Sequence, residues 1–135
     1  MRRLFIDTSG WLAIFHRRDV MHAAASEIYY KRFAAGWHFI THSGVMLEVG
    51  NSLSSARSRQ LAIQLRGILE SSSRMSVVHV TEDLCEAGWQ LYAARPDKDW
   101  GIVDCISFVV MQEHGLREAL TADHHFEQAG FVKLL

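Results

Sequence analysis

The regular alternation of short apolar segments with longer amphipathic ones constrains the fold more than any other feature of this sequence. Short apolar segments with the length and composition of buried strands occur at residues 4–6, 37–41, 76–80, 118–121 and 131–135. Between them, helical spacing of apolar residues predicts helices over 8–16, 19–36, 43–53, 57–71, 81–95 and 102–115, with a loop and short helix over 122–130. This alternation predicts an α/β fold, with a central parallel sheet covered by helices on both faces.

Polar and glycine residues predict several helix ends. Asp19 is the expected N-cap of the helix over 19–36, and Gly36 is its expected end. Gly115 is expected to end the helix over 102–115. The inner face of the helix over 43–53 is expected to carry Val45, Met46, Val49 and Leu53.

Length and composition restrict the classes to which the chain can belong. It has 135 residues, enough for one domain with a buried core, and its 49% hydrophobic and 21% charged content predicts a soluble globular protein. No apolar run is long enough to span a bilayer and no signal peptide is recognised, so no membrane association is expected. Cys85 and Cys105 form no CxxC pair, which favours buried reduced thiols and a cytoplasmic location.

Charge gives little overall support for nucleic-acid binding. The net charge is −1, whereas a basic surface is typical of proteins that bind nucleic acids. Local basic clusters occur at residues 16–19, 29–32 and 56–59. Each of them is predicted as a solvated helix face in preference to a binding patch.

Carboxylates occupy positions where a parallel sheet binds ligands. Asp7 follows the strand over 4–6, and Asp123 follows "ALT" in the same manner. Asp104 lies in the first turn of an otherwise apolar helix, Asp99 lies in the loop before it, and Glu48 lies among apolar residues on another helix. Ligands in such folds bind just beyond the carboxyl ends of the strands, so these acids are expected to converge there.

A local explanation also exists for each acid. Asp7 or Thr8 can cap the following helix, the helix dipole favours Asp104, and Asp123 suits an Asx turn. Glu48 is exposed to solvent if the helix over 43–53 buries a different face from the one expected. These explanations weaken when the acids are taken together, because Asp7, Asp104 and Asp123 are all expected at one edge of one sheet.

The energetics of converging carboxylates indicate a bound cation. Two carboxylates about 4–5 Å apart repel each other by roughly 3–4 kcal/mol at an effective dielectric constant near 20. Protons or cations must neutralise such a cluster, and oxygen ligands suit Mg²⁺ or Mn²⁺, which serve phosphoryl chemistry. No zinc-binding spacing accompanies the eight histidines, so the pair His124–His125 is predicted to be at the surface or to support the ligands.

Four segments of the chain resemble, in order and spacing, segments of the PIN-domain ribonucleases, and among these the VapC-type toxins of bacterial toxin–antitoxin pairs. The four segments are "FIDTSGWLAIF", "SGVMLEVGNSL", "DKDWGIVDCISFVVMQEHGL" and "ALTADHHFEQAGF". The resemblance covers essentially the whole chain and implies a single PIN domain over residues 1–135, with a three-layer α/β/α arrangement. It implies Mg²⁺- or Mn²⁺-dependent endonucleolytic hydrolysis of RNA. The implied acidic quartet is Asp7, Glu48, Asp104 and Asp123.

The resemblance also implies roles for individual residues. Asp7, Asp104 and Asp123 would hold the metal, and Glu48 would orient a water molecule or a second metal. Water would then attack the phosphate and leave a 5′-phosphate and a 3′-hydroxyl. Supporting polar positions fall on Thr8, Ser9 and Asn51, and Asp99 matches an accessory acid. Many members carry Ser or Thr where this chain has Val103, which puts one hydroxyl contact in doubt.

The implied partners are an RNA substrate, a cognate antitoxin whose tail enters the active-site groove, and a second copy of the chain in a homodimer. Contacts to RNA are expected, if anywhere, from Arg17, Arg18, Arg57 and Arg59.

Two other functions fit parts of the pattern. One is a module of the same fold that binds RNA or a protein without cutting, which a metal-dependent cleavage assay distinguishes. The other is a receiver-like domain with a phosphate-accepting aspartate, but that requires an acidic doublet near the first strand and a lysine after the last, and Lys133 lies within the last strand. A phosphatase of the Asp-x-Asp type is disfavoured because position 9 is Ser.

Overall fold

The predicted strands join one parallel sheet in the order β3-β2-β1-β4-β5. The computed structural model describes residues 1–135, and its elements are β1 (Arg3–Ile6), α1 (Thr8–Phe15), α2 (His22–Ala34), β2 (His38–His42), α3 (Ser43–Ser52), α4 (Arg59–Ser71), β3 (Met75–Val78), α5 (Glu82–Ala94), α6 (Ile102–Glu113), β4 (Glu118–Leu120), α7 (His125–Gln128) and β5 (Val132–Lys133). The predicted alternation of strands and helices is therefore confirmed.

The strand order creates a switch point beside β1. From β1 the chain proceeds to β2 and β3 on one side of the sheet, and β4 and β5 extend it on the other side. Ligands of open parallel sheets bind at the carboxyl ends of the strands where the order reverses, which here lies between β1 and β4. Ile6 pairs with Leu120 across these strands, so Asp7 and Thr121 leave the sheet side by side.

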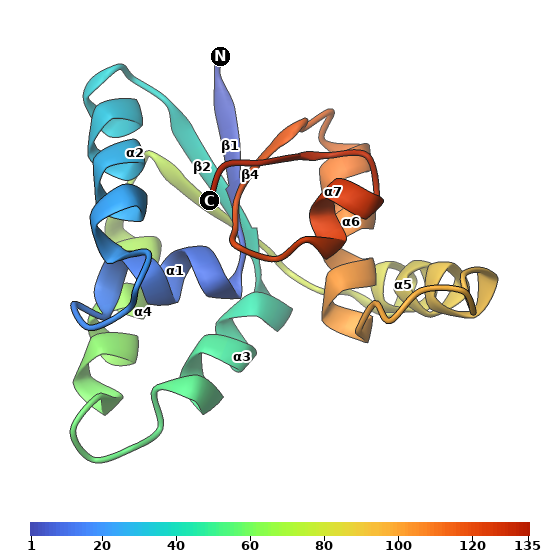
Figure 1. The fold of residues 1–135 in the computed structure, drawn as a ribbon, viewed down its shortest axis with the longest axis horizontal. Helices are drawn as coiled ribbons and strands as arrows, with labels where there is room; N and C mark the ends of the chain where they lie inside the picture. The colour runs from blue at the N-terminus through green and yellow to red at the C-terminus, as the bar shows by residue number, and fades with distance from the viewer.

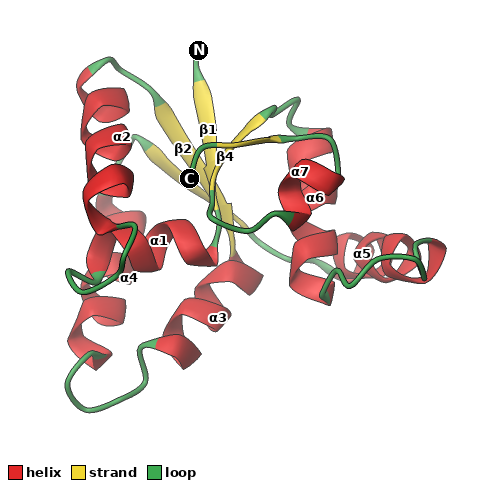
Figure 2. Cartoon of the chain, in the orientation of Figure 1, coloured by secondary structure: helices red, strands yellow, loops and turns green.

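Helices cover both faces of the sheet and make a three-layer α/β/α structure. Figures 1 and 2 show α1, α2 and α4 on one side of the strands, and α5, α6 and α7 on the other. The buried core contains 26 apolar residues, and its largest fully buried side chains include Trp11, Phe5, Phe39, Phe108 and Phe126. No helix combines the length and the apolar character that crossing a membrane would require.

Gly10 allows α1 to begin directly against the end of β4. A Cβ atom at this position would lie 2.1 Å from the carbonyl oxygen of Leu120 and 2.9 Å from a methyl carbon of Ile6. Only glycine fits such an approach, because the nearest atoms belong to the backbone of a sheet strand. The close packing holds the first turn of α1, and with it Asp7, against the end of the sheet.

A buried histidine begins α3. Nδ1 of His42 accepts hydrogen bonds from the backbone N–H groups of Gly44 and Val45, at 3.0 and 3.2 Å. Its other ring nitrogen, Nε2, is 2.8 Å from Oγ of Ser107, which itself donates to the carbonyl of Val103. The ring is therefore neutral, with its proton on Nε2, and burial lowers the pKa of His42 to about 4.

Some predicted boundaries are wrong. The helix predicted over 19–36 begins at His22, because the Asp19 carboxylate accepts from the N–H of Met21 in a turn before the helix. Gly36 ends this segment as predicted, with a φ of +87°. The last strand is also shorter than predicted, and extends over Val132–Lys133.

Candidate active site

Asp7 is buried at the carboxyl end of β1, where its exposed fraction is 7%. It is the N-cap of α1, because its Oδ1 accepts from the N–H of Gly10 at 3.1 Å and from Oγ of Ser9 at 2.9 Å. Its Oδ2 accepts from Oγ1 of Thr121 at 2.9 Å. Burial raises the pKa of the Asp7 carboxyl from 3.8 to about 7, although these hydrogen bonds partly counteract the rise.

Hydroxyl groups connect Asp7 to the loop that follows β4. Oγ of Ser9 accepts from the N–H of Ala122 at 2.9 Å, and Oγ1 of Thr121 accepts from the N–H of Asp123 at 3.0 Å. The two hydroxyls also lie 3.1 Å apart. Ser9 therefore contacts both Asp7 and the loop after β4. This network fixes the positions of Asp7 and Asp123 relative to each other, and the negative charge of Asp123 adds to the rise in the pKa of Asp7.

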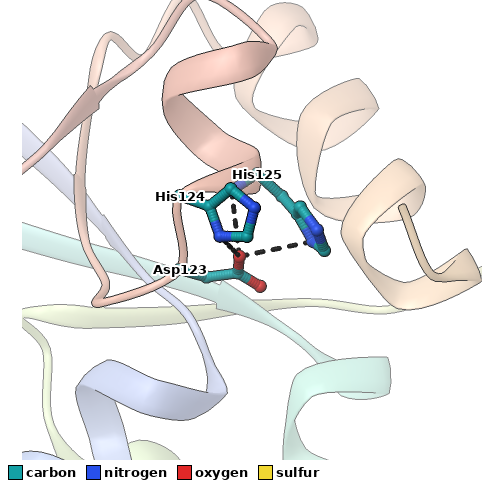
Figure 3. A group of neighbouring side chains, drawn as sticks. All are labelled: Asp123, His124 and His125. Carbon is teal, nitrogen blue, oxygen red and sulfur yellow. Dashed lines mark hydrogen bonds and ion pairs between the residues drawn. The ribbon is translucent and has the colours of Figure 1, made fainter. Parts of the chain in front are cut away.

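His125 brings the other two aspartates together. Its Nδ1 lies 3.0 Å from Oδ2 of Asp104 and 3.3 Å from Oδ1 of Asp123. Figure 3 shows both imidazole rings of the His124–His125 pair around the Asp123 carboxylate. Burial raises the pKa of Asp104, and the nearby charge of Asp123 contributes to the rise. Three segments distant in sequence therefore meet at one edge of the sheet.

The local explanations for these acids are also correct, and they do not compete with a shared site. Asp7 caps α1, Oδ2 of Asp104 accepts from the N–H of Gly101 at 3.0 Å, and Oδ1 of Asp123 accepts from the N–H of His125 at 2.9 Å. Each bond uses part of one carboxylate and turns it toward its neighbours. The same bonds that stabilise the helix starts thereby orient the acids.

The remaining predicted site residues lie at different distances from this centre. Glu48 is exposed on α3, and its Oε1 accepts from Oγ1 of Thr8 at 2.6 Å. Since Thr8 follows Asp7 in the chain, this hydrogen bond places Glu48 beside the site. Asn51 is exposed on the same helix, and its side chain makes no hydrogen bond within the chain. Asp99 is exposed in the loop before α6, without an ion pair or side-chain hydrogen bond.

Sequence reasoning did not assign Thr121 and His125 their contacts. Thr121 is buried and reaches Asp7, which the pairing of β1 with β4 explains. His125 was expected only to lie at the surface or to support ligands, and in the structure it joins two carboxylates. The receiver-like alternative gains no support, because Nζ of Lys133 faces Oε1 of Glu127 at 3.9 Å.

The donor atoms of this edge fit a divalent cation. Burial is the main cause of the raised pKa values of Asp7 and Asp104, and the negative charge of Asp123 adds to both, so a cation beside these carboxylates would be stabilised. Ligand atoms of Asp123, His124 and His125 all lie within 4.8 Å of one another. Carboxylate oxygens suit Mg²⁺ and Mn²⁺, and an imidazole in the set is also compatible with transition metals.

Known proteins resemble this chain over nearly its whole length. The profile of the PIN domain matches residues 4–132. The chain is 29% identical over 131 residues to a protein of Mycobacterium tuberculosis named 23S rRNA-specific endonuclease VapC20, with 97% of both chains covered.

Solved structures show the same fold. The crystal structure of Mycobacterium tuberculosis VapC20, described as a Sarcin-Ricin loop cleaving toxin, has a TM-score of 0.86 and 28% identity, with 96% of this chain and 97% of that chain covered. VapBC2 from Rickettsia felis, solved bound to a DNA fragment from its promoter, has a TM-score of 0.72 and 12% identity, over 97% and 96% of the two chains. The chain therefore belongs to the PIN-domain family, and within that family it is similar to the VapC-type toxin VapC20.

Proposed function

We propose that this protein is a divalent-metal-dependent endoribonuclease and the toxin of a toxin–antitoxin pair. The convergence of Asp7, Asp104 and Asp123 at the switch point of the sheet carries the proposal. It is supported by the similarity over nearly the whole chain to a relative named as a ribosomal RNA endonuclease. Ribosomal RNA is accordingly the first substrate class to test, and the chemistry would be hydrolysis of a phosphodiester bond.

Three carboxylates would hold the cation, namely those of Asp7, Asp104 and Asp123. When bound, the cation supplies positive charge that lowers the pKa of water and stabilises the charge that develops on the phosphate. His125 orients Asp104 and Asp123 through Nδ1, and Thr121 and Ser9 hold Asp7 in place. Because strands and helix starts position these groups, they need little reorganisation when substrate binds.

Glu48 is placed to act on water. Thr8 donates to its Oε1, and its Oε2 makes no hydrogen bond or ion pair within the chain. In our proposal Glu48 orients the attacking water molecule. Water adds to phosphorus, the bond from phosphorus to the 3′-oxygen breaks, and that oxygen takes up a proton. The products are a 5′-phosphate and a 3′-hydroxyl.

We also propose the wider setting of this activity. Residues 1–135 would form one PIN domain, because all five strands share one sheet and one buried core. A cognate antitoxin and a second copy of the chain are the proposed protein partners, and the mass of the complexes in solution tests both. The free thiols of Cys85 and Cys105 suit the reducing cytoplasm, where ribosomal RNA is found.

Replacement of Asp7 by Asn tests the catalytic assignment. Asp7→Asn keeps the size of the side chain and removes a charged ligand, so we expect RNA cleavage in Mn²⁺ to fall by about 100-fold or more, or about 3 kcal/mol of transition-state stabilisation. Asp83→Asn, which removes an equal charge from the exposed start of α5, should cleave like the wild type. Cleavage by Asp7→Asn at the wild-type rate, or wild-type activity that persists in EDTA, would refute the proposal.

A further inference from the structure

Two basic segments that are distant in sequence share one cleft on the surface. Arg17 and Arg18 follow α1, and Arg57 lies in the loop between α3 and α4. Both segments line a cavity of about 480 Å³, which also includes the apolar side chains of Phe15 and Leu61. These arginines are exposed, as predicted, but the prediction that they lie on helix faces is wrong, because they lie in loops that line the same cleft.

The positive charge of this cleft is not neutralised within the chain. Arg17, Arg18 and Arg57 are exposed, and none of them forms an ion pair or a side-chain hydrogen bond. Arg59 differs from them, because its guanidinium donates to the carbonyl of Ser54 and holds the loop in shape. Guanidinium groups with free donors match the oxygens of a phosphate group.

Arg18 also lines an adjoining cavity of about 260 Å³, together with His16, Asp19 and Ser52 at the end of α3. Asp19 is the acidic residue that lines it, and one of its oxygens accepts from the N–H of Met21. One carboxylate against three guanidiniums leaves the region positive.

The cleft lies at the far end of two helices that start beside the carboxylates. α1 runs from Thr8, next to Asp7, to Phe15 at the cleft, and eight helical residues span about 12 Å. α3 carries Glu48 near the acids and ends close to Ser55, which also lines the cleft. Figure 1 shows both helices leaving the same edge of the sheet, with the connecting loops beyond their far ends.

We propose that Arg17, Arg18 and Arg57 bind backbone phosphate groups of the RNA strand, a few nucleotides from the bond that is cut. This inference rests on the proposed function and adds a substrate-anchoring site to it. An anchor is needed because the catalytic edge is itself acidic and the net charge of the chain is −1, so neither attracts RNA. RNA is favoured over an acidic protein because the cleft lies at the end of helices that lead directly from the carboxylates.

A binding measurement tests the anchor without depending on cleavage. In an Asp7→Asn background with Mg²⁺, the Kd of a labelled RNA oligonucleotide is measured by fluorescence anisotropy at several salt concentrations. Adding Arg17→Ala and Arg57→Ala should weaken binding about tenfold and reduce the slope of log K against log salt by about 1.4, or about 0.7 for each lost phosphate contact. Arg17→Lys with Arg57→Lys should retain most of the affinity.

The matched control removes equal charge from the opposite edge of the sheet. Arg2 and Arg117 are exposed and precede β1 and β4. Arg2→Ala with Arg117→Ala should leave the affinity within about twofold of the parent, because only distant charge is lost. The proposal would be overturned if the two double variants bound RNA with equal affinity, or if the parent did not bind RNA at all. Equal affinity of the two double variants would indicate that the cleft binds an acidic protein segment.

Cleavage kinetics separate this inference from the proposed function. In the otherwise wild-type chain, Arg17→Ala with Arg57→Ala should raise KM for a long RNA about tenfold and leave kcat within about twofold, since phosphate contacts distant from the reacting bond contribute uniform binding. For a dinucleotide, which is too short to reach the cleft, KM should not change. A wild-type chain that never cleaves RNA refutes the proposed function, while the binding measurement still decides whether the arginines form an anchor.

Discussion

His42 makes the stability of the fold depend on pH, because its ring must stay neutral to accept from two backbone N–H groups. Its pKa is about 4 in the folded chain and about 6.5 in the unfolded chain. Between these values only the unfolded chain binds the proton, so the free energy of unfolding contributed by His42 falls as the pH drops from 6.5 to 4. The loss amounts to about 3 kcal/mol.

Replacement of His42 by Asn tests this linkage. Asn keeps an acceptor at the start of α3 but does not titrate in this range. We expect His42→Asn to be less stable than the wild type at pH 7.5, because the hydrogen bond to Ser107 is lost. The difference in the free energy of unfolding between variant and wild type should be smaller by about 3 kcal/mol at pH 4. Urea unfolding at a series of pH values measures it. A difference that stays constant across this range would contradict the neutral histidine.

Asp7 changes the stability of the fold with pH in the opposite direction to His42. Burial raises its pKa from 3.8 to about 7, so the folded chain holds a proton that the unfolded chain releases. The buried charge therefore costs stability increasingly as the pH rises from 3.8, up to about 4 kcal/mol above pH 7. In EDTA, Asp7→Asn should be more stable than the wild type at pH 8, by up to this amount, and the gain should disappear near pH 4. Thermal unfolding at both values checks this, and an unchanged or lower midpoint at pH 8 would show that the hydrogen bonds to Ser9 and Thr121 matter more than the charge.

Individual residues also show which part of the site a sequence can reveal. The carboxylates were recognisable because Asp7, Asp104 and Asp123 were all expected at one edge of one sheet, although each also had a local structural reason to be there. The contact of Thr121 with Asp7 was not recognisable, because it depends on β1 pairing with β4 across more than a hundred residues. The cap formed by His42 was hidden for the same reason, since burial against Ser107 of α6 decides its protonation.

At the scale of elements, the start of α1 depends on a residue without a side chain. Gly10→Ala places a methyl group 2.1 Å from the carbonyl oxygen of Leu120, where only a shift of α1 or β4 relieves the overlap. We expect a loss of about 3 kcal/mol in stability, at the upper end for overpacked positions, together with reduced cleavage because Asp7 and Ser9 move with the helix.

Gly67 provides the matched control, because it lies inside α4 and a Cβ atom there would meet nothing within 4 Å. Gly67→Ala should stabilise the chain by about 0.5–1 kcal/mol, the usual gain in a helix interior. Denaturant unfolding compares both variants with the wild type. Equal effects of the two substitutions would show that α1 does not pack against β4 as closely as the structure has it.

The elements themselves followed from hydrophobic spacing, whereas some of their ends did not. Apolar residues at helical spacing predicted the inner face of α3, where Val45 and Val49 are buried, Met46 is partly buried, and Leu53 is buried directly after the last residue of the helix. The start of α2 was predicted three residues too early, because Asp19 forms a turn with Met21 and an aspartate suits a turn as well as an N-cap. Local chemistry alone does not distinguish these two structures.

At the scale of the whole molecule, the sheet order decides which acids meet. A parallel sheet was predictable from the alternation of elements, but the position of β4 beside β1 was not, since nothing within either strand specifies its neighbour. That position brings Asp123 to Asp7, while α6 packs on the opposite face from α1 and brings Asp104 to His125 and Asp123. The order of the strands therefore gathers three acids, each of which begins a helix or a turn, into one acidic centre.

A divalent cation should stabilise the whole fold if this centre binds one. Ligands that bind only the folded chain raise its stability by RT ln(1 + [L]/Kd), which is about 2.7 kcal/mol at a hundredfold excess over Kd. We expect Mn²⁺ to raise the thermal midpoint by several degrees at pH 7.5, as judged from typical unfolding entropies. Asp7→Asn and Asp123→Asn should lose most of this increase, whereas Asp83→Asn, at the start of α5, should keep it. An increase in the thermal midpoint that persists in all three variants would show that the cation binds elsewhere. The acids would then meet in the folded sheet without holding the metal that the proposed chemistry requires.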